Sequence, residues 1–178
     1  MPTGAGKLTA WERQLRNRNF LSPAGFKFTT TRAPKADFFS QSATIPGINL
    51  GTAVQSNYLR DLPVPGDKLV FNDFDLTFFV DENLENYLEI EKWMRGLGYP
   101  ESLGEAIPLD FNTYSDGTLL IFNSNFNNTA KVDFYDMFPV SLTPISFTAQ
   151  ETDINYIMAT ATFKYTIFNV ESLIEDES

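Results

Sequence analysis

The sequence contains no cysteine and no histidine among its 178 residues. The absence of cysteine excludes disulfides and thiolate chemistry. The absence of histidine removes the commonest metal ligand and the side chain best suited to proton transfer near neutral pH. Most hydrolytic and metal-dependent mechanisms therefore lose their usual residues, and we predict a protein that is not an enzyme and has no catalytic, metal or cofactor site.

Long apolar runs are also missing from the sequence. No stretch reaches the roughly 18 to 20 consecutive apolar residues that a membrane span requires, and residues 1–20 lack the apolar core of a signal peptide. We therefore expect a chain that does not insert into membranes and that is intracellular when it is made.

Charge is plentiful but unevenly placed. The chain has 23 acidic and 13 basic residues, and residues 1–36 contain seven of the basic ones and one of the acidic ones. That end therefore carries a net charge of +6, and the remainder carries −16 of the total of −10. An acidic body repels nucleic acid within a Debye length of about 8 to 10 Å. The pattern favours self-association through the basic end, although charge that only keeps the chain soluble explains it equally well.

Aromatic residues form 15% of the chain, and 17 of them are phenylalanine. Such side chains fit the half-buried surface of a sheet better than the interior of a helix, so the fold class is expected to be mainly β. A chain of this length can bury one sizeable core. We predict a basic N-terminal arm over residues 1–22, a β domain over residues 23–170 and an acidic tail over residues 171–178.

The arm contains one helical signal. Thr9 and Glu12 fit a capping box, which predicts a short helix over residues 10–19. Trp11 and Leu15 lie four residues apart and give this helix a narrow apolar stripe. The stripe is flanked by the basic side chains of Arg13, Arg16 and Arg18. A helix this short is not stable alone, so the arm needs a docking surface.

Alternating apolar and polar residues predict strands along most of the domain. These runs cover residues 25–31, 37–45, 48–58, 71–80, 119–122, 130–137 and 145–148, and the longest covers 156–170. Proline and glycine predict loops at residues 46–47 and 62–67. One substantial helix is predicted from Asn83 to the stop signals between Gly96 and Pro100. Strands on both sides of one helix favour an antiparallel β-sandwich or barrel with a flanking α-helix.

Two groups of carboxylates are candidate sites. Asp73 and Asp75 share one strand face and could act as an acid and base pair, but acidic residues on a solvated strand face are far commoner. Residues 81–85 lack the spacing of a calcium loop. Their carboxylates suit the first turn of the predicted helix, where they interact favourably with the helix dipole.

An ordered set of motifs covers residues 25–170. A Pro-Gly-Asp turn at residues 65–67 precedes an alternating strand, an acidic helix start at residues 81–82 and a helix with Trp93 near its end. This order resembles the tail tube proteins of contractile-tailed bacteriophages. The resemblance continues in the strand and Pro turn of residues 42–48, in Phe138 and Pro139, and in Thr152 and Asp153 before the final strand.

The resemblance implies a structural, non-enzymatic subunit of the phage tail tube fold. Six copies would form a ring, and rings would stack head to tail into the inner tube of a viral tail. DNA would pass through the acidic lumen without specific binding. The implied partners are the protein itself, the tail sheath and the baseplate, and the implied location is the virion tail, assembled in the host cytoplasm.

Contacts between subunits are then expected from the arm and from the proline-rich segment. The residues concerned are Trp11, Arg13, Leu15, Arg16, Leu62, Pro63, Pro65, Gly66 and Asp67. The basic residues 1–20 and the loop at residues 99–119 depart from the family pattern and leave open a tube initiator or terminator of the baseplate or neck. Two other classes stay open, a β-barrel that binds a small apolar ligand and a hydrolase that uses paired carboxylates.

Overall fold

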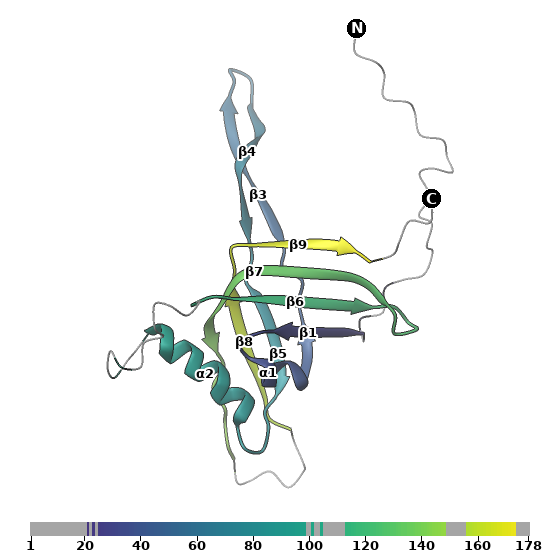
Figure 1. Ribbon diagram of the computed structural model, residues 1–178. Coiled ribbons are helices and arrows are strands. Elements are labelled where there is room, and N and C mark those ends of the chain that lie inside the picture. The colour runs from purple at the N-terminus through teal and green to yellow at the C-terminus, as the bar shows by residue number, and fades with distance from the viewer. Residues whose placement is uncertain are drawn as a thin grey trace.

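The computed structural model describes residues 21, 23, 25–98, 101, 104, 113–148 and 156–173. The described part contains nine strands and two helices (Figure 1). In chain order they are β1 (Phe26–Thr30), α1 (Pro34–Phe38), β2 (Ser40–Ala43), β3 (Ile48–Ser56), β4 (Asp61–Phe71), β5 (Phe74–Phe79), α2 (Glu85–Gly98), β6 (Ser115–Phe122), β7 (Asn128–Leu142), β8 (Met158–Lys164) and β9 (Ile167–Ser172).

Seven strands form one continuous antiparallel sheet that folds over on itself. Its order is β1-β6-β7-β8-β5-β2, and β9 also pairs with β7. Figure 1 shows two layers that cross steeply, one of β1, β6, β9 and the first half of β7, the other of β2, β5, β8 and the second half of β7. The prediction of a mainly β, antiparallel sandwich or barrel with a flanking helix is confirmed.

Strand β7 joins the two layers through a bend at Asp136. Its first half pairs with β6 and β9, and its second half pairs with β8. Asp136 has a φ of 55°, and its N–H donates to Oδ1 of Asp116 at 3.2 Å. The register against β6 shifts at the same place, between Ser115 and Gly117. This is a β-bulge, which bends a strand and redirects its side chains.

Phenylalanine side chains fill the space between the layers. The ring of Phe74 lies 5.1 Å from that of Phe28, 4.7 Å from Phe134 and 6.2 Å from Phe163. All four are at most 1% exposed. The predicted inward faces of β5 and β8 are correct, since alternate residues of both strands are buried. The core is completed by Leu76, Phe78, Ile90, Val132, Met137, Ala159 and Ala161.

Helix α2 covers one side of the core, as predicted. Trp93 is 4% exposed, its ring lies 6.2 Å from that of Phe163, and its indole N–H donates to the carbonyl of Thr113 at 3.2 Å. The guanidinium of Arg32 lies 5.6 Å from the centre of the Trp93 ring, in a cation–π contact. The helix therefore covers one side of the barrel with the aromatic side chain of Trp93.

Several predicted boundaries are wrong. The expected strand over residues 37–45 is shortened to β2 because α1 precedes it, and Pro34 suits the first turn of that helix. Residues 145–148 form no strand. The expected final strand is divided into β8 and β9, because the chain crosses between layers at Thr166, whose N–H donates to Tyr135. Strand β7, with 15 residues, is the longest described strand. Strand β9 ends two residues into the predicted tail.

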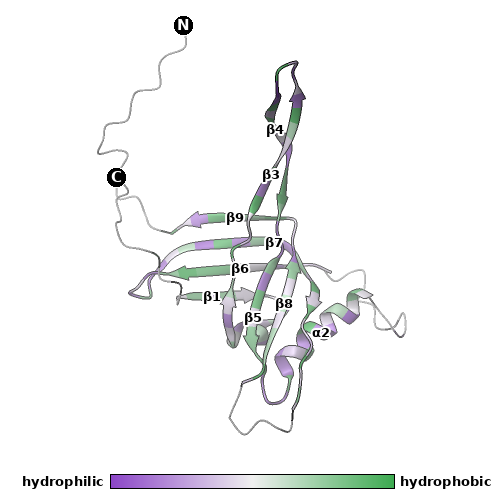
Figure 2. Cartoon of the chain, turned by 180° about the vertical axis from the view of Figure 1, so that it is seen from behind, coloured by the Kyte–Doolittle hydropathy of each residue, from purple (hydrophilic) through white to green (hydrophobic). Residues whose placement is uncertain are grey.

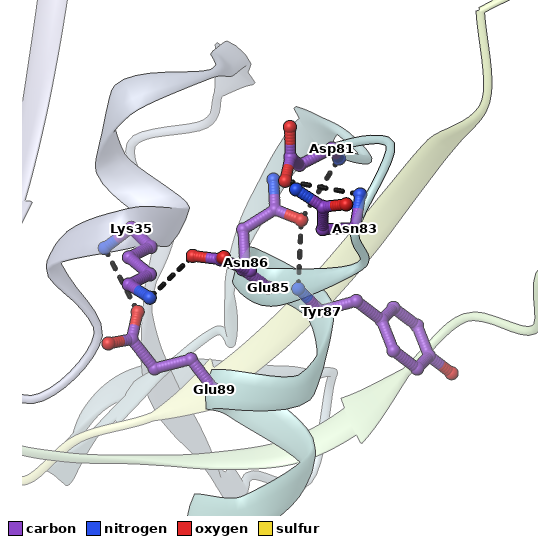
Figure 3. Close-up of polar contacts among 7 residues, drawn as sticks. All are labelled: Lys35, Asp81, Asn83, Glu85, Asn86, Tyr87 and Glu89. Atoms are coloured by element: carbon purple, nitrogen blue, oxygen red, sulfur yellow. Dashed lines mark hydrogen bonds and ion pairs between the residues drawn. The ribbon is translucent and has the colours of Figure 1, made fainter.

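The buried side chain of Asn86 ties β5 to the start of α2, and Figure 3 shows its contacts with Asp81 and Tyr87. Its Nδ2 donates to the carbonyl of Phe79 at 2.7 Å. Its Oδ1 accepts from the N–H groups of Asp81 at 3.2 Å and Tyr87 at 2.9 Å. At 1% exposure, Asn86 satisfies backbone groups that water does not reach.

Replacing Asn86 by leucine should lower the free energy of unfolding by about 1–3 kcal/mol, the usual cost of leaving a buried polar group without its partner. Chemical denaturation followed by circular dichroism measures the change. Asn83→Leu, at an exposed position of the same turn, is the control. Equal stability of the two variants would show that the Asn86 hydrogen bonds contribute nothing.

Candidate assembly surfaces

The hairpin of β3 and β4 projects from one end of the barrel (Figure 1). All nine residues of β3 are exposed. At the tip, Tyr58 is 99% and Leu59 is 88% exposed. Figure 2 shows apolar residues along both strands. The exposed ones are Ile48, Leu50, Val54, Leu69 and Val70. Apolar surface concentrated on one projection makes the hairpin a candidate contact surface.

The predicted contact residues Leu62, Pro63, Pro65, Gly66 and Asp67 all lie in this hairpin. They form part of strand β4, so the expectation of a loop at residues 62–67 is wrong. A two-stranded hairpin has a free edge on each strand, where a proline without an N–H breaks no ladder. Their role in contacts between subunits stays a prediction.

Gly66 forms a bulge in the middle of the hairpin. The register shifts between Leu50 and Thr52, which pair with Leu69 and Pro65. A β-carbon at Gly66 would collide with the carbonyl of Gly51 on the facing strand. The two backbones can approach this closely only without a side chain, so the bulge sets the shape of the projection.

The structure does not describe the four predicted contact residues of the arm. Trp11, Arg13, Leu15 and Arg16 lie outside the described residues, as does the helix expected over residues 10–19. Their role in contacts also stays a prediction.

The opposite end of the barrel, at the end of β5, carries a shallow depression that we name the acidic groove. It is about 320 Å³ in volume and is lined by Phe39, Phe79, Val80, Asp81, Glu82 and Tyr156. Phe39 is 41% and Tyr156 is 76% exposed. The rings of Tyr156 and Phe79 meet edge to face at 5.9 Å. The groove therefore has an aromatic wall and two carboxylates, which come from segments far apart in the sequence.

A second depression, the edge groove, lies beside the start of β1. It is about 580 Å³ in volume and is lined by Gly25, Phe26, Lys27, Thr29, Pro34, Asp37, Ser40, Phe122 and Phe126. Oδ2 of Asp37 accepts from the N–H of Thr30 at 3.3 Å, whereas its Oδ1 is buried without a hydrogen-bond partner. Burial raises the pKa of Asp37 to about 7, and the nearby charge of Glu89 adds to this rise. The Thr30 hydrogen bond and Lys27 oppose it.

This raised pKa makes stability depend on pH. Folded Asp37 holds its proton up to about pH 7, whereas an unfolded aspartate loses it near pH 3.8. Stability from this group is therefore fully present below the lower value and is lost as the pH rises through the higher one. Asp37→Asn should remove this loss, so denaturation midpoints between pH 4 and pH 8 should fall less than in the wild type. Asp61→Asn, at an exposed carboxylate, should keep the wild-type slope; an equal slope in Asp37→Asn would contradict the assignment.

Asp73, just before β5, and Asp75, within it, take part in contacts across the sheet. Asp73 Oδ1 lies 3.1 Å from Nζ of Lys164, and Asp75 Oδ1 accepts from the hydroxyl of Thr162 at 2.7 Å. Among the described residues, no group of three or more histidine, cysteine, aspartate or glutamate side chains could hold a metal ion. Within the same residues, helices long and apolar enough to span a membrane are absent.

Comparison with known proteins gives a family for this architecture. The family model described as "Phage tail tube protein" matches residues 13–171. The "Tail tube terminator protein" of Enterobacteria phage T4 is 25% identical over 138 residues, which are 74% of this chain and 76% of the relative.

Solved structures agree with the fold. A chain of the cap that terminates the tube of the anti-feeding prophage superposes with a TM-score of 0.64 at 16% identity, over 93% of this chain and 99% of that one. A chain of the sheath–tube complex of an extracellular contractile injection system, in its extended state, has a TM-score of 0.62 at 15% identity, over 88% and 94%. These likenesses show the fold that the chain shares with injection-system proteins.

Proposed function

The chain belongs to the phage tail tube protein family, and from this premise we propose that it is the terminator of a tail tube. In this role one hexameric ring of the protein binds the last ring of the tube and ends it. The family is one of structural tail proteins, and the proposal adds a position within the tail to that general role.

The observation that carries the proposal is the match to the T4 tail tube terminator, which extends over 76% of that relative. The hairpin provides a surface through which the ring would bind the tube. Its exposed tip residues Tyr58 and Leu59 project from one end of the barrel, so the two ends of a ring would differ. Contacts between unlike surfaces join rings head to tail, and we assign the hairpin end to the tube.

The remaining partners follow from the same position. A ring at the end of a tube lies next to the end of the sheath, so sheath and tube proteins are its proposed neighbours. The lumen of the ring would continue that of the tube and let DNA pass. An acidic lining would serve this passage, because it repels phosphate.

A repeating tube subunit is the second candidate. The hairpin at one end and the acidic groove at the other give the barrel two unlike ends, which also suits repeated head-to-tail stacking. A ligand-binding barrel has less support, because the interior contains Phe28, Phe74, Phe78, Phe134 and Phe163, all at most 1% exposed.

The copy number in purified tails separates the two candidates. Quantitative mass spectrometry against an isotope-labelled standard should find one ring of this protein per tail if it is the terminator. A copy number that rises with tail length would contradict the proposal and support the repeating subunit. Absence from purified tails would contradict both.

A further inference from the structure

We propose that the basic arm docks on its own chain, with Trp11 in the acidic groove, and so closes that end of the barrel to further copies. The docking would explain why a terminator ring binds no further ring. This consequence rests on the proposed function. Three features support the docking: the size and lining of the groove, the charge of the arm and the positions of the two grooves.

The acidic groove has the size and lining that an aromatic side chain needs. Its volume of about 320 Å³ exceeds the roughly 150 Å³ of an apolar cavity that accepts a benzene molecule. Tyr156 offers exposed ring surface beside Phe79. An added indole could meet these rings edge to face, a geometry that contributes about 0.5–1.5 kcal/mol beyond the buried area.

The charges of the groove and the arm are complementary. Asp81 and Glu82 line the groove. Residues 1–22 carry Lys7, Arg13, Arg16 and Arg18 against Glu12, a net charge of +3, so the rest of the chain carries −13. In the docked arm we take residues 11–13 as extended and not helical, so that Arg13 lies on the same side of the chain as Trp11 and brings a guanidinium beside the carboxylates when the indole enters. Arginine pairs with carboxylates through two parallel hydrogen bonds.

The two grooves are lined by consecutive residues of the chain, so they come close together at one place. The arm joins the domain at Gly25, which lines the edge groove together with Ser40. Phe39, the residue before Ser40, lines the acidic groove. That place is the junction of α1 and β2. The 14 residue steps from Gly25 to Trp11 reach up to about 46 Å when extended. This exceeds the roughly 30 Å diameter of a small domain, so Trp11 can reach the groove of its own chain.

Asp37 adds a reason for a cation near this place. It lines the edge groove, and its Oδ1 is buried without a hydrogen-bond partner. The ionised form of Asp37 would be stabilised by positive charge in this groove, and an arginine of the arm that passes the groove would add its charge to that of Lys27. Both grooves thus present acidic groups to a basic segment.

The consequence concerns assembly at the groove end. A ring whose six grooves are filled by its own arms presents no open aromatic surface there, whereas its hairpin end stays free to bind the tube. The ring would then bind the last ring of the tube through its hairpin end, and no further ring would be added at its groove end.

Limited proteolysis of the full chain tests the docking. Trypsin should cut the wild-type arm after Arg13 and Arg16 slowly, and Tyr156→Ala should raise the cleavage rate at least tenfold. Tyr156 is 76% exposed, so its loss should leave the barrel folded, which circular dichroism checks. Tyr58→Ala, which removes another exposed tyrosine at the hairpin, should leave the rate unchanged. A wild-type arm cut as fast as the arm of Tyr156→Ala would overturn the proposal.

Engineered cysteines test whether the arm binds its own chain, because the natural chain has none. Arg13→Cys combined in turn with Asp81→Cys and Glu82→Cys should give a disulfide within one chain on non-reducing gels. Arg13→Cys with Asp61→Cys, an acidic position on the hairpin, should stay reduced. Disulfides only between chains, or equally in the hairpin pair, would overturn own-chain docking. The copy number in tails is independent of this result, so the proposed function can fail or stand separately.

Discussion

A variant with aspartate at both Tyr58 and Leu59 is expected to lose its place in the tail while the barrel keeps its stability. The two side chains are 99% and 88% exposed, so the folded monomer gains no buried charge. In an assembled tail the partner would cover both positions, and burying two carboxylates without partners costs several kcal/mol. Incorporation into tails should therefore fall by more than 100-fold.

Mass spectrometry of purified tails measures this loss, and thermal unfolding of the purified variant shows whether the fold is intact. Phe147→Asp is the matched control, because it places a charge at another exposed apolar side chain outside the hairpin. Phe147 is 76% exposed. Wild-type incorporation of the doubly substituted chain would show that the hairpin tip does not bind the tube.

The largest effect on stability is expected from Phe74→Ala. Phe74 is fully buried and contacts the rings of Phe28, Phe134 and Phe163 from both layers. Removing it leaves a cavity where the layers meet, and such a substitution costs about 3–5 kcal/mol. Since small domains have only about 5–15 kcal/mol of stability in total, the variant should unfold at a much lower denaturant concentration.

Urea unfolding followed by circular dichroism measures the shift of the midpoint. Phe147→Ala removes the same group from an exposed position and should change the free energy of unfolding by less than about 0.5 kcal/mol. Similar midpoints for the two variants would contradict the placement of Phe74 at the centre of the core.

Local patterns in the sequence predicted the parts of the fold that have a regular period. Alternation placed the buried faces of β5 and β8, and helical spacing placed α2. Helix α1 was missed because five residues are too few to show a helical period. The segment at residues 62–67 was interpreted as a loop because proline and glycine usually interrupt strands, and nothing local shows that a hairpin projects there.

The candidate surfaces depend on contacts between distant segments, which a single sequence does not reveal. Asn86 looks like an ordinary polar helix residue, and its burial is explained by its hydrogen bonds to the backbone of Phe79 on β5 and of Asp81. Phe39 and Tyr156 belong to opposite halves of the sequence, and the fold brings them to one groove. The hydrophobic pattern predicts neither pairing. The excess of basic residues in residues 1–22, in contrast, is a matter of composition alone, and the arm itself stays a prediction.

The most direct test of the terminator assignment is negative-stain electron microscopy of the purified protein over a range of protein and salt concentrations. We expect single hexameric rings that do not lengthen as the concentration rises. Long, uniform tubes would contradict this assignment and identify a repeating tube subunit, and monomers under every condition would contradict any ring.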